Sequence, residues 1–269
     1  MAPSEKIGSI ADVLIIGAGA SGLLAAKHLT ANGFDVVCLE QGQKVDHAGF
    51  WGDKPEFELM TQKLWHPNPN VRDMESDYPI DTTDSDVPIL MYNAVGGTTI
   101  LYGAHWQRFM PSDFKVKTLD GVADDWPFTY EDLEPFYDEL DIEIGVSGMG
   151  GDPAFPHLKA PPLPPLPIGK MGMRAAEGMN KLGWHWWPAP NSILSKPYDG
   201  RNPCGLRGTC RNGCVEGAKA TFDLIYLPIA LKNGLRLISG ARVREVLVND
   251  EGLATGAVYV DRNGRERRQ

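Results

Sequence analysis

The sequence lacks several features that would place the protein in a special class. Its apolar runs fall short of the roughly 18–20 residues that a membrane-spanning helix needs, so no transmembrane segment is expected. Four cysteines in 269 residues are too few for a disulfide scaffold. The polar stretch Met1–Ile10 has no apolar secretory region. Nothing therefore directs export, and we expect a cytoplasmic protein.

Basic residues are also in short supply. The chain has 26 lysines and arginines against 35 aspartates and glutamates, which gives a net charge of −9. Because an acidic surface repels phosphate backbones, nucleic-acid binding is not expected. The rest of the composition, with 42% apolar and 23% charged residues, is that of an ordinary globular protein.

The first forty residues carry a β-α-β pattern. The short apolar run Asp12–Ile16 is typical of a strand buried on both faces of a parallel sheet, and it leads into the glycine-rich turn Gly17–Gly22. An Ala/Leu-rich stretch then predicts a helix whose end is capped by Gly33. Asp35–Glu40 predicts a second buried strand.

Gly17, Gly19 and Gly22 have the G-x-G-x-x-G spacing of dinucleotide-binding turns. These glycines allow a tight turn, close approach of the backbone to a diphosphate, and close helix–strand packing. The helix N-terminus behind them offers N–H groups and positive partial charge to the phosphates. Glu40 ends the second strand, where a carboxylate can bind both ribose hydroxyls and disfavours the 2′-phosphate of NADP. We therefore predict dinucleotide binding.

The motif alone fits either NAD or FAD. It is followed by the long irregular stretch from Gln41 to Val87 and not by a second compact β-α-β unit, which favours a buried FAD. Stretches of that length without periodicity are uncommon unless they are functional. We expect this one to wrap over the ligand. An NAD-dependent dehydrogenase is the alternative.

A second glycine-rich turn occupies Asn93–Thr99. Gly96 and Gly97 let backbone amides approach a flat ring or a phosphate, and Thr98 and Thr99 add hydroxyl donors. A simple turn is the alternative interpretation.

The middle of the chain predicts three further elements. Thr129, with Asp132 three residues later, predicts the start of a helix near residue 130. The proline-rich segment 153–168 predicts an extended connector. Trp184–Trp187 predicts an aromatic strand, whose rings either pack in a sheet or stack on a sugar or polyphenol.

The last thirty residues predict two strands and a hairpin. Ala241–Val248 alternates as a strand, and Ala254–Val260 returns after a turn. Asn263-Gly264 is a strong hairpin signal, but no second arm is evident before Gln269. An unpaired arm indicates a truncated chain, the N-terminal portion of a longer protein.

Taken in order, these motifs resemble the glucose-methanol-choline (GMC) flavoprotein oxidoreductases over nearly the whole chain. The resemblance is to the bacterial sugar-oxidising branch, which includes C-glycoside 3-oxidases, pyranose oxidase-like enzymes and the flavin subunits of gluconate, glucose and fructose dehydrogenases. The motifs that carry it are Gly17–Gly22, Glu40, Val95–Thr99, Asp125–Tyr137, Gly145–Gly148, Gly217–Ala220 and Ala241–Arg244.

The resemblance implies an α/β fold with two parts. A Rossmann-like FAD-binding domain of the GMC type is expected at residues 1–112 and 200–269, and part of an inserted substrate-binding domain at 113–199. The implied activity is oxidation of a sugar or glycoside hydroxyl to a ketone, with hydride transfer to flavin N5. The electrons then pass to oxygen, a quinone or a redox partner, and the sequence does not distinguish between these three acceptors.

The family's catalytic histidine lies late in the chain, at positions expected beyond Gln269. The fragment is therefore expected to be catalytically incomplete. A truncated protein that binds a nucleotide without turnover is the second alternative.

The resemblance also implies where the cofactor binds. It places the isoalloxazine near Gly96 and Gly97 and the adenine near Val243. Some relatives bond the flavin covalently through a histidine where this chain has Leu101, so non-covalent FAD is expected. His105 lies nearby but out of register, and a packed or exposed histidine is the alternative to a flavin-facing one. The predicted FAD-binding residues are Gly17, Gly19, Ala20, Ser21, Gly22, Glu40, Gln41, Gly96, Gly97, Thr98, Thr99, Tyr102 and Val243.

Three cysteines, Cys204, Cys210 and Cys214, lie within eleven residues. Thiolates favour zinc or iron–sulfur clusters, and a structural zinc site would need a fourth ligand. The spacing resembles that of sugar-dehydrogenase flavin subunits, which hold a three-iron cluster with it. A buried thiol group or a disulfide is the alternative. Cys38, inside the second strand, is expected in the core.

Overall fold

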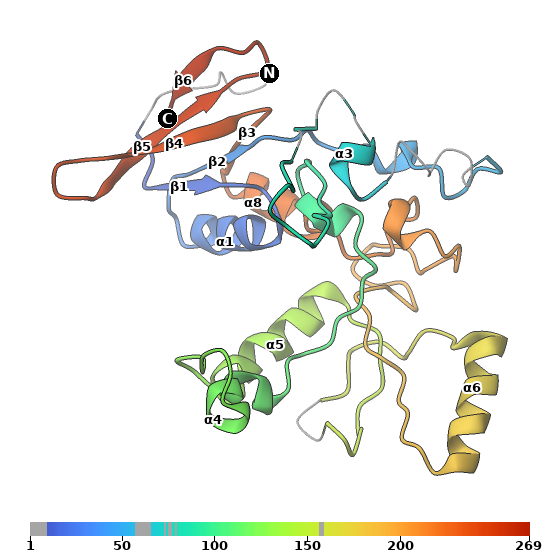
Figure 1. The fold of residues 1–269 in the computed structure, drawn as a ribbon. Coiled ribbons are helices and arrows are strands. Elements are labelled where there is room, and N and C mark those ends of the chain that lie inside the picture. Colours follow the sequence, from blue (N-terminus) through green and yellow to red (C-terminus); the bar gives the residue numbers. More distant parts are fainter. Residues whose placement is uncertain (1–9, 57–65, 73, 75–76, 79, 156–158) are drawn as a thin grey trace. The chain divides into compact units, whose positions relative to one another are not determined.

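The computed structural model describes residues 10–56, 66–72, 74, 77–78, 80–155 and 159–269 (Figure 1). The chain divides into two units. The first comprises Met1–Tyr102, Arg207–Gly217 and Thr221–Gln269, and the second comprises Gly103–Leu206 and Ala218–Ala220. The cofactor and substrate roles assigned to residues 1–112 with 200–269 and to 113–199 stay predictions. Among the described residues, no helix has the length and apolar character needed to cross a membrane.

The first unit is built on a three-stranded parallel sheet in the order β1-β2-β3. The strands are β1 (Val13–Ile16), β2 (Val36–Glu40) and β3 (Arg236–Ser239). All five residues of β2 are buried, as its continuous apolar run predicts for a central parallel strand. The carboxyl ends of β2 and β3 meet where Glu40 pairs with Ser239.

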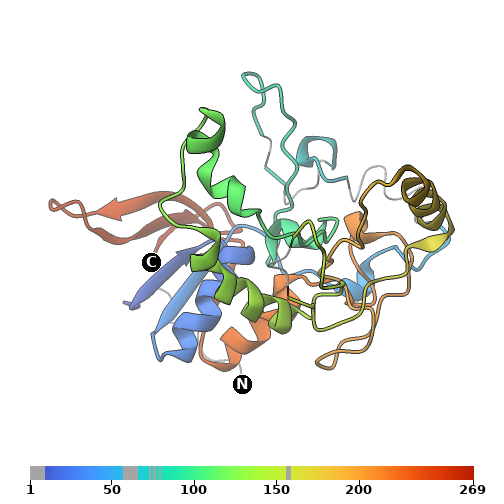
Figure 2. The same ribbon diagram turned by 90° about the horizontal axis from the view of Figure 1, so that it is seen from below.

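Helices cover one face of this sheet. α1 (Ala20–Ala31) follows β1 directly and ends before Gly33, which takes the left-handed φ of +84° expected of a capping glycine. α7 (Phe222–Ile225) and α8 (Leu227–Lys232) pack against α1. Figures 1 and 2 show α1 and α8 side by side. The predicted β-α-β unit is therefore present.

A second, antiparallel sheet contains β4 (Arg242–Val248), β5 (Ala254–Val260) and β6 (Glu266–Arg268). The prediction that the Asn263-Gly264 hairpin has no second arm is wrong, because β6 is that arm and pairs with β5. The sequence Glu266-Arg267-Arg268 is charged and exposed throughout. It therefore shows none of the apolar alternation by which a strand is recognised.

The two sheets share a core. Its buried members are Val37 and Leu39 from β2, Ala257 and Tyr259 from β5, and Ala241. Because β2 supplies side chains to this cluster on one face and faces the helices on the other, it is covered on both sides. The core thereby fixes the end of β2, where Glu40 lies.

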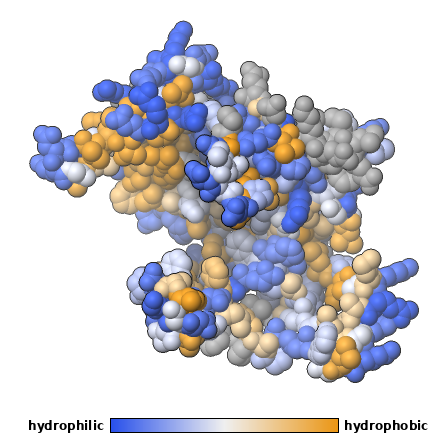
Figure 3. All heavy atoms as spheres, in the orientation of Figure 1, coloured by the Kyte–Doolittle hydropathy of each residue, from blue (hydrophilic) through white to orange (hydrophobic). Residues whose placement is uncertain are grey.

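β1 differs from its prediction, because it is not buried on both faces. Its residues are only partly buried, and Ile16 is 50% exposed. Among the described residues β1 pairs with β2 alone, so it is an edge strand. A groove of about 650 Å³ runs along it, lined in part by Ile10, Leu14, Ile16 and Val246. Figure 3 shows apolar residues on the surface between the β4–β5 hairpin and the region of α1.

The stretch from Gln41 to Val87 has short helices only, in the parts that the structure describes. They are the 3₁₀ turn η1 (His47–Gly49) and α3 (Pro69–Arg72). The two further 3₁₀ turns of the first unit are η2 (Gly97–Ile100) and η4 (Cys210–Asn212). Residues 57–65, 73, 75–76 and 79 lie outside the described residues, so the wrapping of this stretch over a ligand stays a prediction.

The second unit contains the 3₁₀ turn η3 (Pro111–Lys115) and the helices α4 (Val116–Asp120), α5 (Tyr130–Ile144) and α6 (Gly169–Leu182). The predicted helix start is confirmed, since the Thr129 N–H donates to Asp132 Oδ2 at 2.9 Å. The aromatic strand is wrong: Trp184–Trp187 follows α6 without forming a strand. Two of its indole N–H groups are bonded separately, Trp186 to Asn180 and Trp187 to the Met149 carbonyl.

Candidate functional site

The first glycine loop joins β1 to α1 at the carboxyl end of the parallel sheet. The Gly17 N–H donates to the Leu39 carbonyl at 2.8 Å, which ties the loop to β2. A Cβ built on Gly22 would overlap the Gly17 carbonyl oxygen and approach Ile15 Cγ2 to 3.2 Å. Only glycine at position 22 therefore lets the first turn of α1 pack this closely on the loop.

The N-terminus of α1 is open. Gly19 is its N-cap, and among the described residues no side-chain cap bonds the first turn. A Cβ built on Gly19 would meet no atom within 4 Å. Backbone N–H groups in a first helical turn have no intrahelical acceptor, and the helix dipole adds positive partial charge. The loop therefore leaves room and donors for an anionic group such as a diphosphate.

The second glycine turn packs against the first. The Gly96 N–H donates to the Ala18 carbonyl at 2.7 Å. A Cβ built on Gly97 would lie 3.0 Å from the Gly19 Cα. Gly96 and Gly97 have φ values of +99° and +58°, a backbone region that favours glycine. Two turns far apart in the sequence are thus brought into contact, and the second turn has no space for a side chain at Gly97, where it meets Gly19.

Glu40 is buried, with 6% exposure, at the end of β2. Its Oε2 accepts the Ala18 N–H and its Oε1 accepts the Gly42 N–H, both at 2.7 Å. The sequence predicts contact with ribose hydroxyls, and the structure adds a second role, because the carboxylate holds the glycine loop. Each carboxylate oxygen has a further lone pair. The ribose contact stays a prediction.

A cavity of about 370 Å³ brings these pieces together. This volume lies in the usual range of small-molecule sites. Seven of the predicted FAD-binding residues line it, whereas Gly17, Ser21, Gly22 and Gly96 shape the loops behind it. The lining residues are Gly19, Ala20, Glu40, Gln41, Met91, Tyr92, Asn93, Ala94, Gly97, Thr98 and Thr99.

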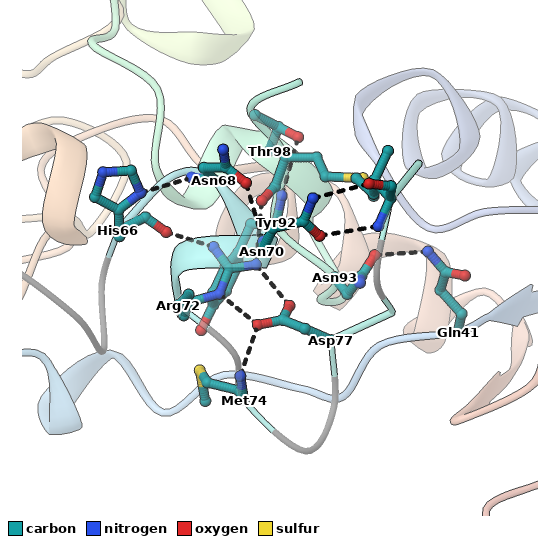
Figure 4. A network of polar contacts seen from close by, with 12 residues as sticks. Gln41, His66, Asn68, Asn70, Arg72, Met74, Asp77, Tyr92, Asn93 and Thr98 are labelled. Carbon is teal, nitrogen blue, oxygen red and sulfur yellow. Dashed lines mark hydrogen bonds and ion pairs between the residues drawn. The ribbon is translucent and has the colours of Figure 1, made fainter. Parts of the chain in front are cut away.

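One wall of the cavity is formed by Met91–Ala94; sequence reasoning missed Met91 and Tyr92, and it included Asn93 and Ala94 only as the start of the second glycine turn. Figure 4 shows how the wall is joined to the end of β2: Gln41 Nε2 donates to Asn93 Oδ1 at 2.6 Å. Gly42 packs so closely on the backbone of Asn93 and Ala94 that a Cβ at position 42 would overlap it. Burial raises the pKa of the Tyr92 hydroxyl, so this group stays neutral and able to donate. The one signal for Met91 and Tyr92 is their place directly before the glycine turn.

A buried ion pair supports the same wall (Figure 4). Arg72 is 1% exposed, and its guanidinium donates to Asp77 Oδ1 at 2.6 Å and Oδ2 at 2.8 Å. The guanidinium also donates to the Met91 carbonyl at 3.2 Å and lies 4.9 Å from the centre of the Tyr92 ring. Arg72 thereby fixes the segment at Met91 and Tyr92 that lines the cavity.

Two predicted residues lie away from the cavity lining. Tyr102 is half-buried at the end of the first unit's opening segment. Val243 is partly buried and packs on the core cluster that contains Leu39 and Tyr259. Their contacts with a cofactor stay predictions. His105 is exposed and belongs to the second unit.

The three-cysteine cluster is divided between the units. Cys204 belongs to the second unit, whereas Cys210 and Cys214 belong to the first. All three are partly buried thiols outside any disulfide. In the part of the chain that the structure describes, no group of three or more His, Cys, Asp or Glu side chains is arranged to hold a metal ion. The structure therefore does not support the iron–sulfur interpretation, nor does it contain the alternative disulfide.

The fourth cysteine, Cys38, lies in the core as predicted. It is fully buried in β2. Burial, followed by the nearby charge of Glu40, raises the pKa of its thiol to about 12. This thiol stays protonated at neutral pH.

The second unit contains a cavity of its own, of about 340 Å³. Trp187 and Phe155 supply aromatic surface, and Trp187 is held by its bond to the Met149 carbonyl at 2.8 Å. Asp152 pairs with His185 Nε2 at 2.8 Å. The lining residues are Gln107, Arg108, Met110, Asp152, Ala154, Phe155, Trp187, Pro188, Ala189 and Pro190. Aromatic surface beside a few polar groups is typical of small-ligand sites.

Comparison with known proteins gives one family model and several relatives. A model described as an NAD(P)-binding Rossmann-like domain matches residues 15–76. The 2-methyl-1,2-propanediol dehydrogenase of Mycolicibacterium austroafricanum is 40% identical over 253 residues, which cover 93% of this chain and 45% of that protein. The fructose dehydrogenase large subunit of Gluconobacter japonicus is 32% identical over 270 residues, which cover 93% and 49%. The chain spans about half the length of the curated relatives it matches.

Solved structures share the fold at low sequence identity. Pyridoxine 4-oxidase from Mesorbium loti has a TM-score of 0.59 and 18% identity, covering 96% of this chain and 48% of that one. A formate oxidase variant from Aspergillus oryzae RIB40, studied for its effect on FAD modification, has a TM-score of 0.53 and 14% identity, covering 97% and 44%. Together with the matched family model, these likenesses confirm the predicted Rossmann-like α/β fold.

Proposed function

Because the chain belongs to the GMC-type oxidoreductases, we propose that it binds FAD in an enzyme that oxidises a hydroxyl group of an alcohol or sugar. The observation that supports this proposal most directly is the cavity at the N-terminus of α1, which Glu40 and the second glycine turn both line. The open helix N-terminus fits a diphosphate, and a carboxylate at the end of β2 fits a ribose. The formate oxidase variant that shares the fold was studied for FAD modification, and this supports FAD as the dinucleotide.

The chain's own residues would divide the binding of this cofactor among them. The amides at Gly19 and Ala20 would hold the diphosphate, and Glu40 would accept hydrogen bonds from the ribose. The backbone of Gly97–Thr99, which lines the cavity, would approach the flat ring, and the missing side chain at Gly97 lets this turn pack against Gly19. When bound, FAD would supply the acceptor for the hydride of an alcohol carbon.

We also propose that FAD is held without a covalent bond. Leu101 stands where some family members have a flavin-linked histidine. It is 4% exposed and packs in a cluster with Phe50, Ala94 and Ile100. An aliphatic side chain offers no atom for such a bond, and this one is committed to the core.

The substrate proposed is a sugar or another polyhydroxylated compound. Its support is the chemistry named for two relatives, a propanediol and fructose. The cavity of the second unit, with the face of Trp187 beside Asp152 and Gln107, is where we propose that a sugar ring packs. Carbon-bound hydrogens on a sugar face suit an aromatic surface, and its hydroxyls suit the polar groups.

The test is a visible absorption spectrum of the purified chain after equilibration with FAD and removal of unbound cofactor. The expected result is the flavin band in the protein fraction, with all of the flavin released on denaturation because no covalent bond holds it. Flavin left on the denatured protein would contradict the non-covalent proposal. A protein fraction that stays colourless but retains NAD would favour the alternative, an NAD-dependent dehydrogenase.

A further inference from the structure

A histidine and an aspartate that are far apart in the sequence form a buried pair in the first unit. His47 Nε2 lies 2.7 Å from Asp223 Oδ2, and their side chains are 14% and 9% exposed. His47 lies in η1, after β2, and Asp223 lies in the first turn of α7. Neither residue lines the cavity at the N-terminus of α1.

The imidazole of His47 is fixed on several sides. Its Nδ1 lies 3.4 Å from the Cys214 carbonyl oxygen. Its ring meets the ring of Phe50 edge-on, with centroids 5.2 Å apart. Phe50 is fully buried in the cluster with Ala94 and Ile100, the residues on either side of the second glycine turn. His47 is therefore connected to this turn through packing as well as through Asp223.

The carboxylate of Asp223 lies against the turn itself. A Cβ built on Gly96 would be 3.0 Å from Asp223 Oδ1 and 3.2 Å from Asp223 Cβ. This Oδ1 is buried and has no hydrogen-bond partner among the described residues. Thr99 gives a second link, since its hydroxyl donates to the Gly96 carbonyl at 2.5 Å and accepts the Phe222 N–H at 3.3 Å. The first turn of α7 thus contacts the glycine turn at two points.

We propose that His47 and Asp223 are positioning residues for the Gly96–Gly97 turn. By holding the carboxylate against the turn, His47 keeps the backbone of Gly97–Thr99 at the cavity wall. The link to FAD rests on the function proposed above, whereas the effect on the turn does not.

The first experiment needs no cofactor. Hydrogen exchange is measured on the peptide that covers the turn, where the amides of Gly96, Gly97 and Leu101 donate to Ala18, Ala94 and Thr98 carbonyls. In Asp223→Asn and His47→Ala we expect these amides to exchange at least about fivefold faster, because the turn opens more often. His47→Gln keeps a side-chain N–H near the Nε2 position and should restore most of the protection.

The matched control is Asp35→Asn. Asp35 also forms an ion pair in the first unit, with Arg236 at 2.8 Å, but it lies at the opposite end of the parallel strands from the glycine loops. Its loss should leave exchange in the turn unchanged. Equal acceleration in Asp35→Asn, or no acceleration in Asp223→Asn and His47→Ala, would overturn the proposal.

The second experiment titrates each variant with FAD. We expect Asp223→Asn and His47→Ala to weaken FAD binding at least about tenfold and to shift the absorption band of bound flavin, because the turn that lines the cavity is no longer held in place. The double variant should match the more affected single variant, since the two residues act as one unit. Additive losses would overturn the pairing.

Two outcomes separate this inference from the proposed function. If the wild-type chain binds no FAD, the proposed function fails, while hydrogen exchange still decides whether the pair holds the turn. If exchange accelerates but FAD binding is unchanged, the link between the pair and the cofactor is wrong. If Asp223→Asn does not fold, the contrast between His47→Ala and His47→Gln carries the test.

Discussion

The carboxylate of Glu40 accepts the backbone N–H of Ala18 at 2.7 Å. Its other oxygen accepts the N–H of Gly42 at the same distance. One side chain at the end of β2 therefore holds both the loop that begins α1 and the segment that packs against the cavity wall. The residue that the sequence marks as a ligand contact is also what keeps the site in shape.

Glu40→Gln should destabilise the protein and weaken cofactor binding together. The variant keeps one acceptor but turns an amide N–H toward a backbone N–H, so a charge-assisted hydrogen bond is lost at a buried position. The expected loss is about 2 kcal/mol of unfolding free energy, measured by urea denaturation. Glu177→Gln, at an exposed helical pair with Arg174, should change stability little. Equal free energies of unfolding for the two variants would show that the Glu40 carboxylate does not hold the loop and the segment at Gly42 in place.

Asp77→Asn should be more damaging. It leaves the guanidinium of Arg72 buried without its charge partner, beneath the wall at Met91 and Tyr92. Removing one member of a buried ion pair costs about 3–5 kcal/mol. Thermal unfolding should detect the loss without any cofactor. A melting temperature within a degree or two of the wild-type value would show that the pair does not hold this wall.

The thiol of Cys38 should make stability depend on alkaline pH. Its pKa rises from an ordinary value of 9.0 to about 12 in the folded chain. The unfolded chain therefore loses this proton first, so the contribution to stability is complete below about pH 9 and falls as pH rises toward the folded-state pKa, by about 1.4 kcal/mol per pH unit. Denaturation of wild type and Cys38→Ala between these limits isolates the effect. A difference between the two that stays constant with pH would contradict it.

Trp187 and Trp184 offer a matched pair for the proposed sugar site. Trp187 lines the cavity of the second unit, whereas Trp184 is 63% exposed and does not line it. With a simple methyl glycoside as probe, Trp187→Ala should weaken binding about tenfold or more, measured by calorimetry. Trp184→Ala should bind as the wild type does. Equal binding by both variants would remove the cavity from the proposed function.

The parts of the site that the sequence predicts are the ones that local patterns encode. Gly17, Gly19 and Gly22 follow an apolar run and precede a helix, and each spacing reflects one packing requirement. Glu40 is identified because it ends the next strand. The contact between Gly96 and Ala18 completes the site, and the sequence indicates that second turn only by its paired glycines.

The rest depends on contacts between distant segments. Arg72 reaches Met91, and His47 reaches Asp223 across 176 positions, and neither pair belongs to a periodic or spaced motif. β6 is missed because an exposed, charged strand has no apolar alternation. At Trp184–Trp187 the error is the opposite one, a predicted strand that does not form. Aromatic residues favour strands, but here they follow the end of α6 without pairing as a strand. Tertiary context decided each of these elements.

Binding of an FAD diphosphate at the open N-terminus of α1 is tested most directly by comparing the dissociation constants for FAD of Gly19→Leu and Gly178→Leu. A Cβ at either glycine meets no atom within 4 Å, and neither has a positive φ, so both variants should fold. Gly19 lines the cavity, whereas Gly178 lies in α6 of the second unit. We expect Gly19→Leu to weaken FAD binding at least about a hundredfold and Gly178→Leu to leave it unchanged. Unaltered FAD binding by folded Gly19→Leu would show that the diphosphate does not bind at this helix terminus.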